Sequence, residues 1–560
     1  MARIIKGRQM AARYYKGREV LKEYKGGRLV YEKQSSIPDY LCFTALEAGQ
    51  FTLTIPAAVT ATYLSYIEWS KDGRTWNHTD NTSEAVTIDV QVAQGEKVYW
   101  RGKAQRYATS TNNYCCFSSD CRFTAKGVLK SLLFAEDFVT HVDGTWTSVY
   151  NYALSQLFRG CTTLIDASEL ILPRGHLAVA QLLGLFRDCT NLVRGADLPA
   201  TGVNGSTYYW LYYNCTSLER LPNIAATTIT DTSGGNGNYA FYYAFYDCTS
   251  MTGSVTLNLT QVKGKQLFDT CFRGCKISSV DITMQSYDLQ GLVFRNCFYL
   301  CTNLNHVRCT IDPSLATSDD FQNWLSGVSS TGTFIQAEGV EWPRGASGIP
   351  TGWVIVEKRT MPSGYKQLLW VSTDSKAYVN TGIAGNNDNL KITTVFNMSA
   401  YVDWGAIYGN YVGDSYNVTR LVQGSSDACS CCNLNVKSNN SGNQFDYDVF
   451  HINIPHMVIQ SKNSVIYNGT TINISGKERG TANSGYIALG NRSMTNPNTT
   501  RNIGLCIYTH KIEDTSLSSV LCDYVACVRE SDSKAGFYDF VSNAFIPSAT
   551  SSDFTAGEEI

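Results

Sequence analysis

The sequence predicts a multi-domain, mainly β protein with an N-terminal β-hairpin anchor, a β-sandwich, a mixed α+β repeat solenoid and a C-terminal sandwich. Three observations predict this order: Lys-Gly units repeat in the first 33 residues, apolar and polar residues then alternate, and a Cys-Thr unit recurs along the middle of the chain. A chain of 560 residues is long enough for about three to five domains. We place their boundaries at residues 1–36, 37–125, 126–358 and 359–560.

The first segment contains three similar units, IIKGRQM, YYKGREVL and EYKGGRLVYE. An apolar or aromatic pair, a Gly turn and a further apolar stretch are typical of a short β-hairpin. The segment holds ten Lys or Arg residues and three Glu, whereas the rest of the chain is acidic. An ordinary β-meander is one interpretation, and a basic tag that docks on an acidic protein surface is the other. The docking residues would be Lys6, Arg8, Lys16, Arg18, Lys25 and Arg28.

The second segment alternates with a period of two. Phe51, Leu53 and Ile55 alternate with Thr, and Val86, Ile88, Val90 and Val92 alternate with polar residues. An Asp-Gly turn at 72–73 separates two further apolar runs. Alternation around such a turn predicts an antiparallel β-sandwich.

The third segment contains the internal repeats, such as LFRGCTTL, LFRDCTNL and LYYNCTSL. Their aligned cysteines recur every 26 to 33 residues, which is solenoid spacing. We expect each unit to form a short helix, a tight turn through Cys-Thr and a strand, and to bury its apolar face only against its neighbours. We expect the cysteines to be reduced, buried and able to donate a weak S–H bond to a carbonyl. The repeat-core cysteines are Cys161, Cys189, Cys215, Cys248, Cys275 and Cys301.

The fourth segment consists of short alternating runs separated by Asn, Gly and Ser turns, as a sandwich requires. LKITTVF, YIALG and IGLCIYTHKI are examples.

These patterns resemble known families. The aromatic-x-x-Cys-Thr-x-Leu unit, often followed by Leu-Pro, resembles the BspA-like leucine-rich repeats of gut bacteria and their phages. The two ends of the last segment, PSGYKQLLWVSTDSKAYVNTGI and GFYDFVSNAFIPSATSSDFTAGEEI, are similar to the concanavalin A-like (LamG-type) jelly-roll domains of phage fibres. The resemblance implies a leucine-rich-repeat solenoid followed by a lectin-type domain.

Aromatic residues mark the first candidate ligand site. The runs YYWLYY and YAFYYAFY exceed what one buried stripe can hold, so some rings should reach the surface. A tyrosine there offers a flat apolar face and a hydroxyl to a sugar, whereas packing between repeats is the alternative for each ring. The candidates are Tyr209, Trp210 and Tyr243.

The loop DWGAIYGNYVGDSYN provides the second candidate site. Jelly-roll lectins, which the last segment resembles, bind carbohydrate with such Asp, Asn and aromatic loops, sometimes through calcium; a solvated loop is the alternative. We expect no other cofactor and no metal site, because Cys429, Cys431 and Cys432 lack paired CxxC spacing. The candidates in this loop are Asp403, Trp404, Tyr408, Asn410, Tyr411 and Asp414.

Catalytic motifs are absent from the sequence: the seven His form no HExxH, and there is no GxSxG, Walker A or GxGxxG before a helix. We therefore expect no catalytic residues. The acidic body argues against nucleic-acid binding, and no apolar run is long enough for a signal peptide or a membrane span.

The resemblance and these exclusions favour a bacteriophage virion fibre, made in the host cytoplasm, that attaches through its N-terminus to a capsid or tail protein. Its repeats and lectin-like domain would bind a host-surface glycan or protein, and we expect a homo-oligomer of undefined number. A bacterial surface BspA-like adhesin and a capsule-degrading glycoside hydrolase are the alternatives.

Overall fold

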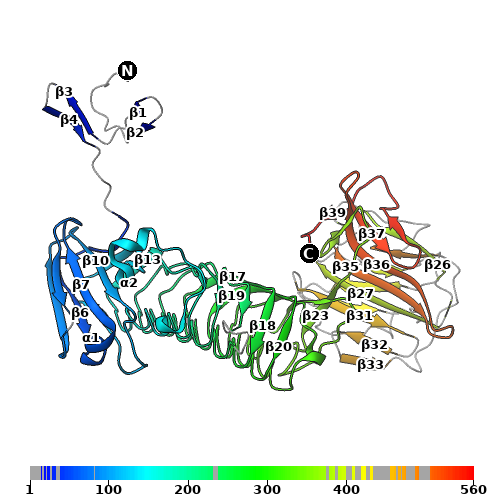
Figure 1. The fold of residues 1–560 in the computed structure, drawn as a ribbon. Helices are drawn as coiled ribbons and strands as arrows, with labels where there is room; N and C mark the ends of the chain where they lie inside the picture. Colours follow the sequence, from blue (N-terminus) through cyan, green and yellow to red (C-terminus); the bar gives the residue numbers. More distant parts are fainter. Residues whose placement is uncertain are drawn as a thin grey trace.

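The protein is mainly β, with two short α-helices and several separate sheets among the residues that this computed structural model describes (Figure 1). The described residues are 38–373 without 81 and 231–236, then 377–384, 387, 389–398, 454–461, 486–490 and 505–560. Isolated strands are described at 14–15, 18–19, 22–25, 28–32, 406–409, 418–423, 429–432, 464–467 and 470–473.

Two of the three predicted N-terminal hairpins lie within the described strands. β1 (Tyr14–Tyr15) pairs antiparallel with β2 (Arg18–Glu19), and β3 (Lys22–Lys25) pairs antiparallel with β4 (Arg28–Glu32). The dipeptides between the paired strands, Lys16-Gly17 and Gly26-Gly27, lie outside the described residues. Arg18, Lys25 and Arg28 lie on these strands, whereas Lys6, Arg8 and Lys16 lie outside the described residues.

The second segment forms two packed sheets, and the predicted alternation is present in it. Phe51, Leu53 and Ile55 are buried while Thr54 between them is exposed. The larger sheet has the order β13-β12-β5-β10-β7-β8 and the smaller β11-β6-β9. The elements are β5 (Leu41–Ala45), β6 (Gly49–Ile55), α1 (Ala57–Tyr63), β7 (Leu64–Ser70), β8 (Asn77–Asp80), β9 (Val86–Val92), β10 (Lys97–Ala104), β11 (Cys116–Ser119), β12 (Phe123–Val128) and β13 (Leu164–Ile171).

The boundary that we placed between residues 125 and 126 falls inside a continuous structure. β12 pairs in parallel with β13, which belongs to the first repeat. Phe158 of that repeat lies 5.7 Å from Phe43 and 5.5 Å from Phe117, measured between ring centroids. One hydrophobic core therefore runs from Leu41 to Trp353, because the first repeat closes the end of the sandwich. Short helices cover this junction: α2 (Ser131–Phe134), η1 (Ala135–Val139) and η2 (Ser148–Tyr150).

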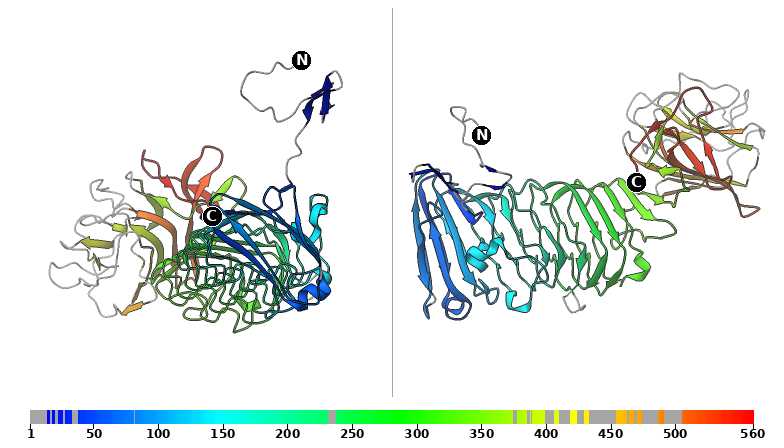
Figure 2. Two further views of the ribbon diagram at one scale, coloured as in Figure 1. Left: turned by 90° about the vertical axis from the view of Figure 1, so that its left-hand side faces the viewer. Right: turned by 45° about the horizontal axis from the view of Figure 1, so that its top comes forward.

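The repeat units stack as successive coils of the chain between the two end modules (Figures 1 and 2). Two parallel ladders connect the coils, with the orders β14-β15-β16-β18-β20 and β17-β19-β21-β22-β23. The first ladder contains β14 (Gly175–His176), β15 (Ala200–Val203), β16 (Thr228–Ile229), β18 (Gln261–Gly264) and β20 (Tyr287–Leu289). The second contains β17 (Thr252–Leu259), β19 (Lys276–Met284), β21 (His306–Cys309), β22 (Gly332–Ala337) and β23 (Trp353–Lys358), with η3 (Pro313–Leu315) between β21 and β22.

The Cys-Thr units do not contain the short helix that we expected. Every fourth residue has a positive φ, as at Ser206 (56°), Trp210 (58°) and Asn214 (58°), which a right-handed helix cannot accept. Backbone N–H groups instead alternate between two acceptors: Tyr208 N donates across the coils to Ala240 O, and Tyr209 N donates back to Ser206 O. The units therefore form consecutive turns, because hydrogen bonds between coils satisfy half of the backbone N–H groups that a helix would satisfy internally.

The six repeat cysteines are buried free thiols along the stack. The Cys189 thiol donates to the carbonyl of Phe158 at 2.9 Å, and Cys215 donates to that of Phe186 at 3.0 Å. Burial raises the pKa of the Cys301 thiol to about 12. Each thiol of this series thus bonds to the preceding coil, except Cys161 at its start, which lies 3.8 Å from Thr163 Oγ1. The remaining bonds join Cys248 to Tyr212, Cys275 to Phe245 and Cys301 to Phe272.

The C-terminal module has its own core and two described sheets, both antiparallel. The larger contains β24 (Tyr365–Gln367), β25 (Val371–Ser372), β27 (Leu390–Met398), β31 (His456–Gln460), β32 (Ser464–Tyr467), β33 (Thr470–Asn473), β35 (Leu505–Asp514), β36 (Ser519–Arg529), β37 (Lys534–Asp539), β38 (Ala544–Ile546) and β39 (Thr555–Ala556). The smaller contains β26 (Val379–Ala384), β28 (Ala406–Gly409), β29 (Val418–Gln423), β30 (Cys429–Cys432) and β34 (Tyr486–Leu489).

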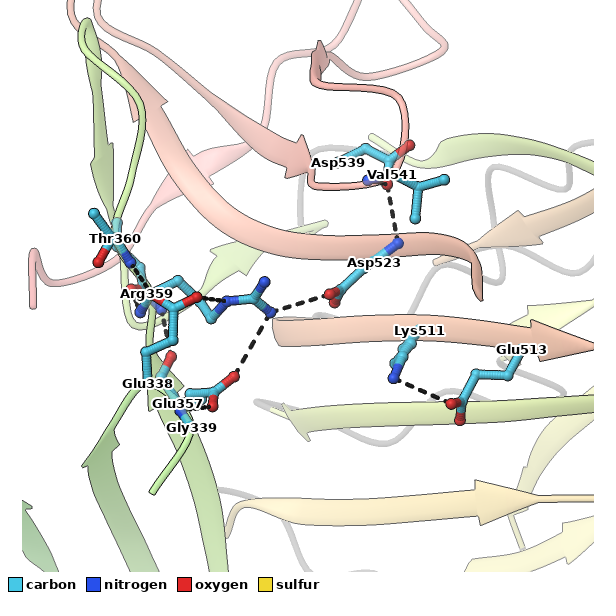
Figure 3. A network of polar contacts seen from close by, with 11 residues as sticks. Glu338, Gly339, Glu357, Arg359, Thr360, Lys511, Glu513, Asp523, Asp539 and Val541 are labelled. Atoms are coloured by element: carbon cyan, nitrogen blue, oxygen red, sulfur yellow. Dashed lines mark hydrogen bonds and ion pairs between the residues drawn. The ribbon is translucent and has the colours of Figure 1, made fainter. Parts of the chain in front are cut away.

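Arg359 connects the last coil to this module (Figure 3). Its guanidinium lies 3.0 Å from Glu338 of the repeat region and 3.0 Å from Asp523 of β36, and it stacks 4.1 Å over Phe540. A small apolar cluster beside it also takes residues from both parts, including Val356 and Tyr508. The junction is therefore packed and ion-paired.

Candidate functional site

A four-residue period decides which side chains of each coil reach the surface. In the coil that contains Cys215, Tyr208 and Tyr212 are buried, whereas Tyr209, Trp210 and Tyr213 are half-buried. Consecutive turns bring every fourth residue back to the same side, so two residues point into the core and the next two point outward. The Tyr212 hydroxyl donates to the carbonyl of Ala196 at 2.7 Å, which places it in the packed interior.

Two neighbouring coils present half-buried rings that contact one another. Tyr209 lies 4.1 Å from Trp210 in its own coil and 5.0 Å from Tyr242 in the next, measured between ring centroids. Tyr242 in turn lies 4.4 Å from Tyr243. We call this surface the aromatic face; its members are Tyr209, Trp210, Tyr213, Tyr239, Tyr242, Tyr243 and Tyr246.

The rings of the aromatic face meet edge-on, tilted and parallel. Tyr242 is edge-on to Tyr209, at 74°, and to Tyr239, at 90°. Tyr213 and Tyr246 lie parallel, with planes 5° apart and centroids 4.9 Å apart. Edge-on contacts leave ring faces uncovered, whereas parallel stacking covers them.

Arginines flank the aromatic face on both sides. Arg187, in the preceding coil, has its guanidinium carbon 4.3 Å from the ring centre of Trp210 and 5.2 Å from that of Tyr213. Arg273, in the following coil, lies 5.3 Å from the ring centre of Tyr246. These distances are those of cation–π contacts.

A buried ion pair lies next to the aromatic face. Asp269 is fully buried and accepts two bonds from the Arg295 guanidinium, at 3.1 and 2.5 Å, and one from Thr270 at 2.8 Å. These bonds raise the pKa of Arg295. Burial raises the pKa of Tyr242, and the neighbouring Tyr243 and Asp269 raise this pKa further. This carboxylate is thus saturated by partners.

The structure brings together the three aromatic candidates of the repeats, since Tyr209, Trp210 and Tyr243 all lie on the aromatic face. Sequence reasoning did not single out Arg187 and Arg273. Both arginines precede the repeat cysteine by two residues, which is the position that Tyr213 and Tyr246 hold in their own repeats. This shared position before the repeat cysteine is the signal from which the two arginines could have been predicted to lie beside the tyrosines.

Of the second candidate set, the loop at residues 403–417, the structure describes one candidate side chain, and this side chain is buried. Tyr408 on β28 is 1% exposed, and its hydroxyl donates to Gln460. It is a core residue, so it is not available to a surface ligand as we had expected. The other members lie outside the described residues: Asp403, Trp404, Asn410, Tyr411 and Asp414.

Comparison with known proteins gives no identity. No protein-family model, curated protein or solved structure matches this chain. Within the described ranges, no group of three or more His, Cys, Asp or Glu side chains could hold a metal ion. No helix described there has the length and hydropathy that crossing a membrane requires.

Proposed function

We propose that this protein is a non-enzymatic binding protein of a bacteriophage virion, a fibre whose stacked coils hold a host-surface glycan. The observation that carries the proposal is the aromatic face, where seven half-buried rings from two coils lie together. Edge-on packing leaves ring faces for the apolar side of a sugar, and tyrosine hydroxyls can bond to its OH groups. Arg187 and Arg273 supply further donors.

The chemistry of the face favours holding over cutting. A glycoside hydrolase needs two carboxyl groups on opposite sides of the scissile bond, one of them able to donate a proton. Asp269 is buried and bonded to Arg295, and Asp188 accepts from Asn214 at 3.1 Å and lies 3.3 Å from Arg187. Carboxylates with such partners serve structure better than acid catalysis.

The architecture we infer has three working parts. The coils form a solenoid of BspA-like leucine-rich repeats, which the two parallel ladders and the buried cysteine series support. The C-terminal antiparallel sheets form a concanavalin A-like jelly roll. The basic hairpins dock on an acidic capsid or tail protein, for which their charge is the argument.

The experiment compares the wild type with Tyr209→Ala/Tyr242→Ala on immobilised envelope polysaccharides of candidate hosts. We expect roughly tenfold weaker binding, because the two substitutions remove apolar ring faces and hydroxyls that would contact the sugar. Tyr99→Ala is the matched control, since Tyr99 is a half-buried tyrosine on β10 of the first module. Equal binding by all three proteins would contradict the proposal. Release of reducing sugar during the same incubation would favour the hydrolase instead.

A further inference from the structure

Four side chains form a row at equivalent positions of four successive coils: Arg187, Tyr213, Tyr246 and Arg273. Backbone bonds set this register, since Asp188 N donates to Tyr213 O, Asn214 N donates to Tyr246 O, and Asp247 N donates to Arg273 O. We call these four residues the guanidinium row. Two cations therefore bracket two stacked rings along the axis of the coils.

The ring faces within the guanidinium row are already covered. Tyr213 and Tyr246 stack on each other, Arg187 lies 5.2 Å from the centre of Tyr213, and Arg273 lies 5.3 Å from that of Tyr246. Beyond Arg273, Tyr299 lies 5.1 Å away on the next coil. This row therefore offers a sugar no open ring face. What it offers are tyrosine hydroxyls and the hydrogen-bonding edges of two guanidinium groups.

The donors of these two guanidiniums are largely unused. A guanidinium has five N–H donors. Among the described residues, Arg273 makes no side-chain hydrogen bond or ion pair, and Arg187 makes one ion-pair contact, from its buried Nε to Asp188. Arg295, one coil beyond Arg273, shows the contrast, because it forms two bonds to Asp269.

The carboxylates nearest to the row leave most of these donors free. Asp188 lies 3.3 Å from Arg187 Nε, but its other oxygen accepts from Asn214. Asp247 faces Arg273, yet burial raises the pKa of its carboxyl more than the guanidinium lowers it. A guanidinium that is stacked between rings and has free N–H groups is preorganised for bidentate binding of an oxyanion.

We infer that the guanidinium row recognises the anionic groups of an acidic polysaccharide. This inference rests on the proposed glycan-binding function and names the class of glycan. Arg187 and Arg273 bind two oxyanions of one extended chain that runs along the coil axis, while the open rings beside them contact the sugar backbone.

The experiment measures binding of polyglucuronate, of its carboxyl-reduced product and of a sulfated glucan to the full chain. We expect Arg187→Gln/Arg273→Gln to bind polyglucuronate or the sulfated glucan at least tenfold more weakly than the wild type. The polymer with the larger loss identifies the oxyanion. Arg194→Gln is the matched control, because Arg194 is 63% exposed and pairs with Asp166 away from the row. Carboxyl-reduced polymer should bind weakly and equally to all three proteins.

Two results would overturn the inference. Equal losses in Arg194→Gln and in the double variant would show that only general positive charge matters. Wild-type binding of neutral glycans that depends on Tyr209 and Tyr242 but not on the two arginines would leave the proposed function standing and remove its acidic specificity. Absence of binding to every neutral, carboxylated and sulfated polymer would remove both.

Discussion

Tyr213 and Tyr246 stack face to face, with ring centroids 4.9 Å apart, although 33 residues of chain separate them. The neighbouring core rings Phe186, Tyr212 and Phe245 stack at 5.0 and 5.4 Å in the same register. The longest of the repeats therefore keeps the spacing of the others. Surface chemistry in this protein is set by coil register, because residues far apart in sequence become neighbours wherever their coils stack.

The buried ion pair next to the aromatic face should contribute to stability. We expect Arg295→Ala to lower the free energy of unfolding by about 3 kcal/mol, because it leaves the fully buried Asp269 carboxylate without its cation. The double variant Arg295→Ala/Asp269→Ala should lose less, since no uncompensated charge remains. Urea unfolding of the two variants measures this difference. A single variant as stable as the wild type would contradict the assignment.

The repeat thiols should be inert until the coils open. Burial raises the pKa of Cys189, Cys215 and Cys275, so the reactive thiolate is not populated near neutral pH. A chromogenic disulfide reagent should modify these residues only in denaturant, as mass spectrometry of the peptides would show. Rapid labelling of Cys215 in the native protein would contradict its burial.

Removal of one repeat thiol should cost stability through a lost bond and a small cavity. We expect Cys215→Ala to lower the free energy of unfolding by about 1–2 kcal/mol, because the carbonyl of Phe186 loses its S–H partner. Cys506→Ala serves as control, since Cys506 is only partly buried and lies outside the repeats. Thermal unfolding of both variants tests this, and equal losses would count against a special role for the series.

The C-terminal module should lose stability in acid. His510 on β35 is buried, and desolvation lowers its pKa from 6.5 to about 3. Between these values the unfolded chain binds a proton that the folded module does not, so stability is full above pH 6.5 and falls as the pH drops toward 3. The slope is at most about 1.4 kcal/mol per pH unit. Unfolding midpoints from pH 7 to 4 should decline less in His510→Gln, and parallel declines would disprove the contribution.

The N-terminal hairpins should be needed for assembly and not for folding. Deletion of residues 1–33 removes a net positive charge but no residue of either large core. We expect a folded product that no longer joins the particle, measured by its recovery in purified virions. Incorporation at the wild-type level would remove the docking proposal.

Local sequence patterns were enough to predict several features of the fold. Alternation at Phe51, Leu53 and Ile55 predicted strand and burial, because the pleat of a strand alternates its side chains. The repeated Cys-Thr unit predicted stacked units with buried cysteines, since each unit can bury its apolar face only against its neighbours. The Gly turns of the N-terminal segment predicted the hairpins that β1 to β4 form.

Only the tertiary structure decided the backbone of the units and the composition of the site. Bonding between coils replaced the expected helices with turns, and no single repeat carries that information. The sequence singled out Tyr209, Trp210 and Tyr243 but did not separate the other tyrosines of the two runs. The phase of the turns places Tyr208 and Tyr212 in the core and Tyr209 and Tyr213 on the outside. The amino-acid sequence determines the order of the units. The proximity of Arg187, Tyr213, Tyr246 and Arg273 depends on contacts that form only when the coils stack.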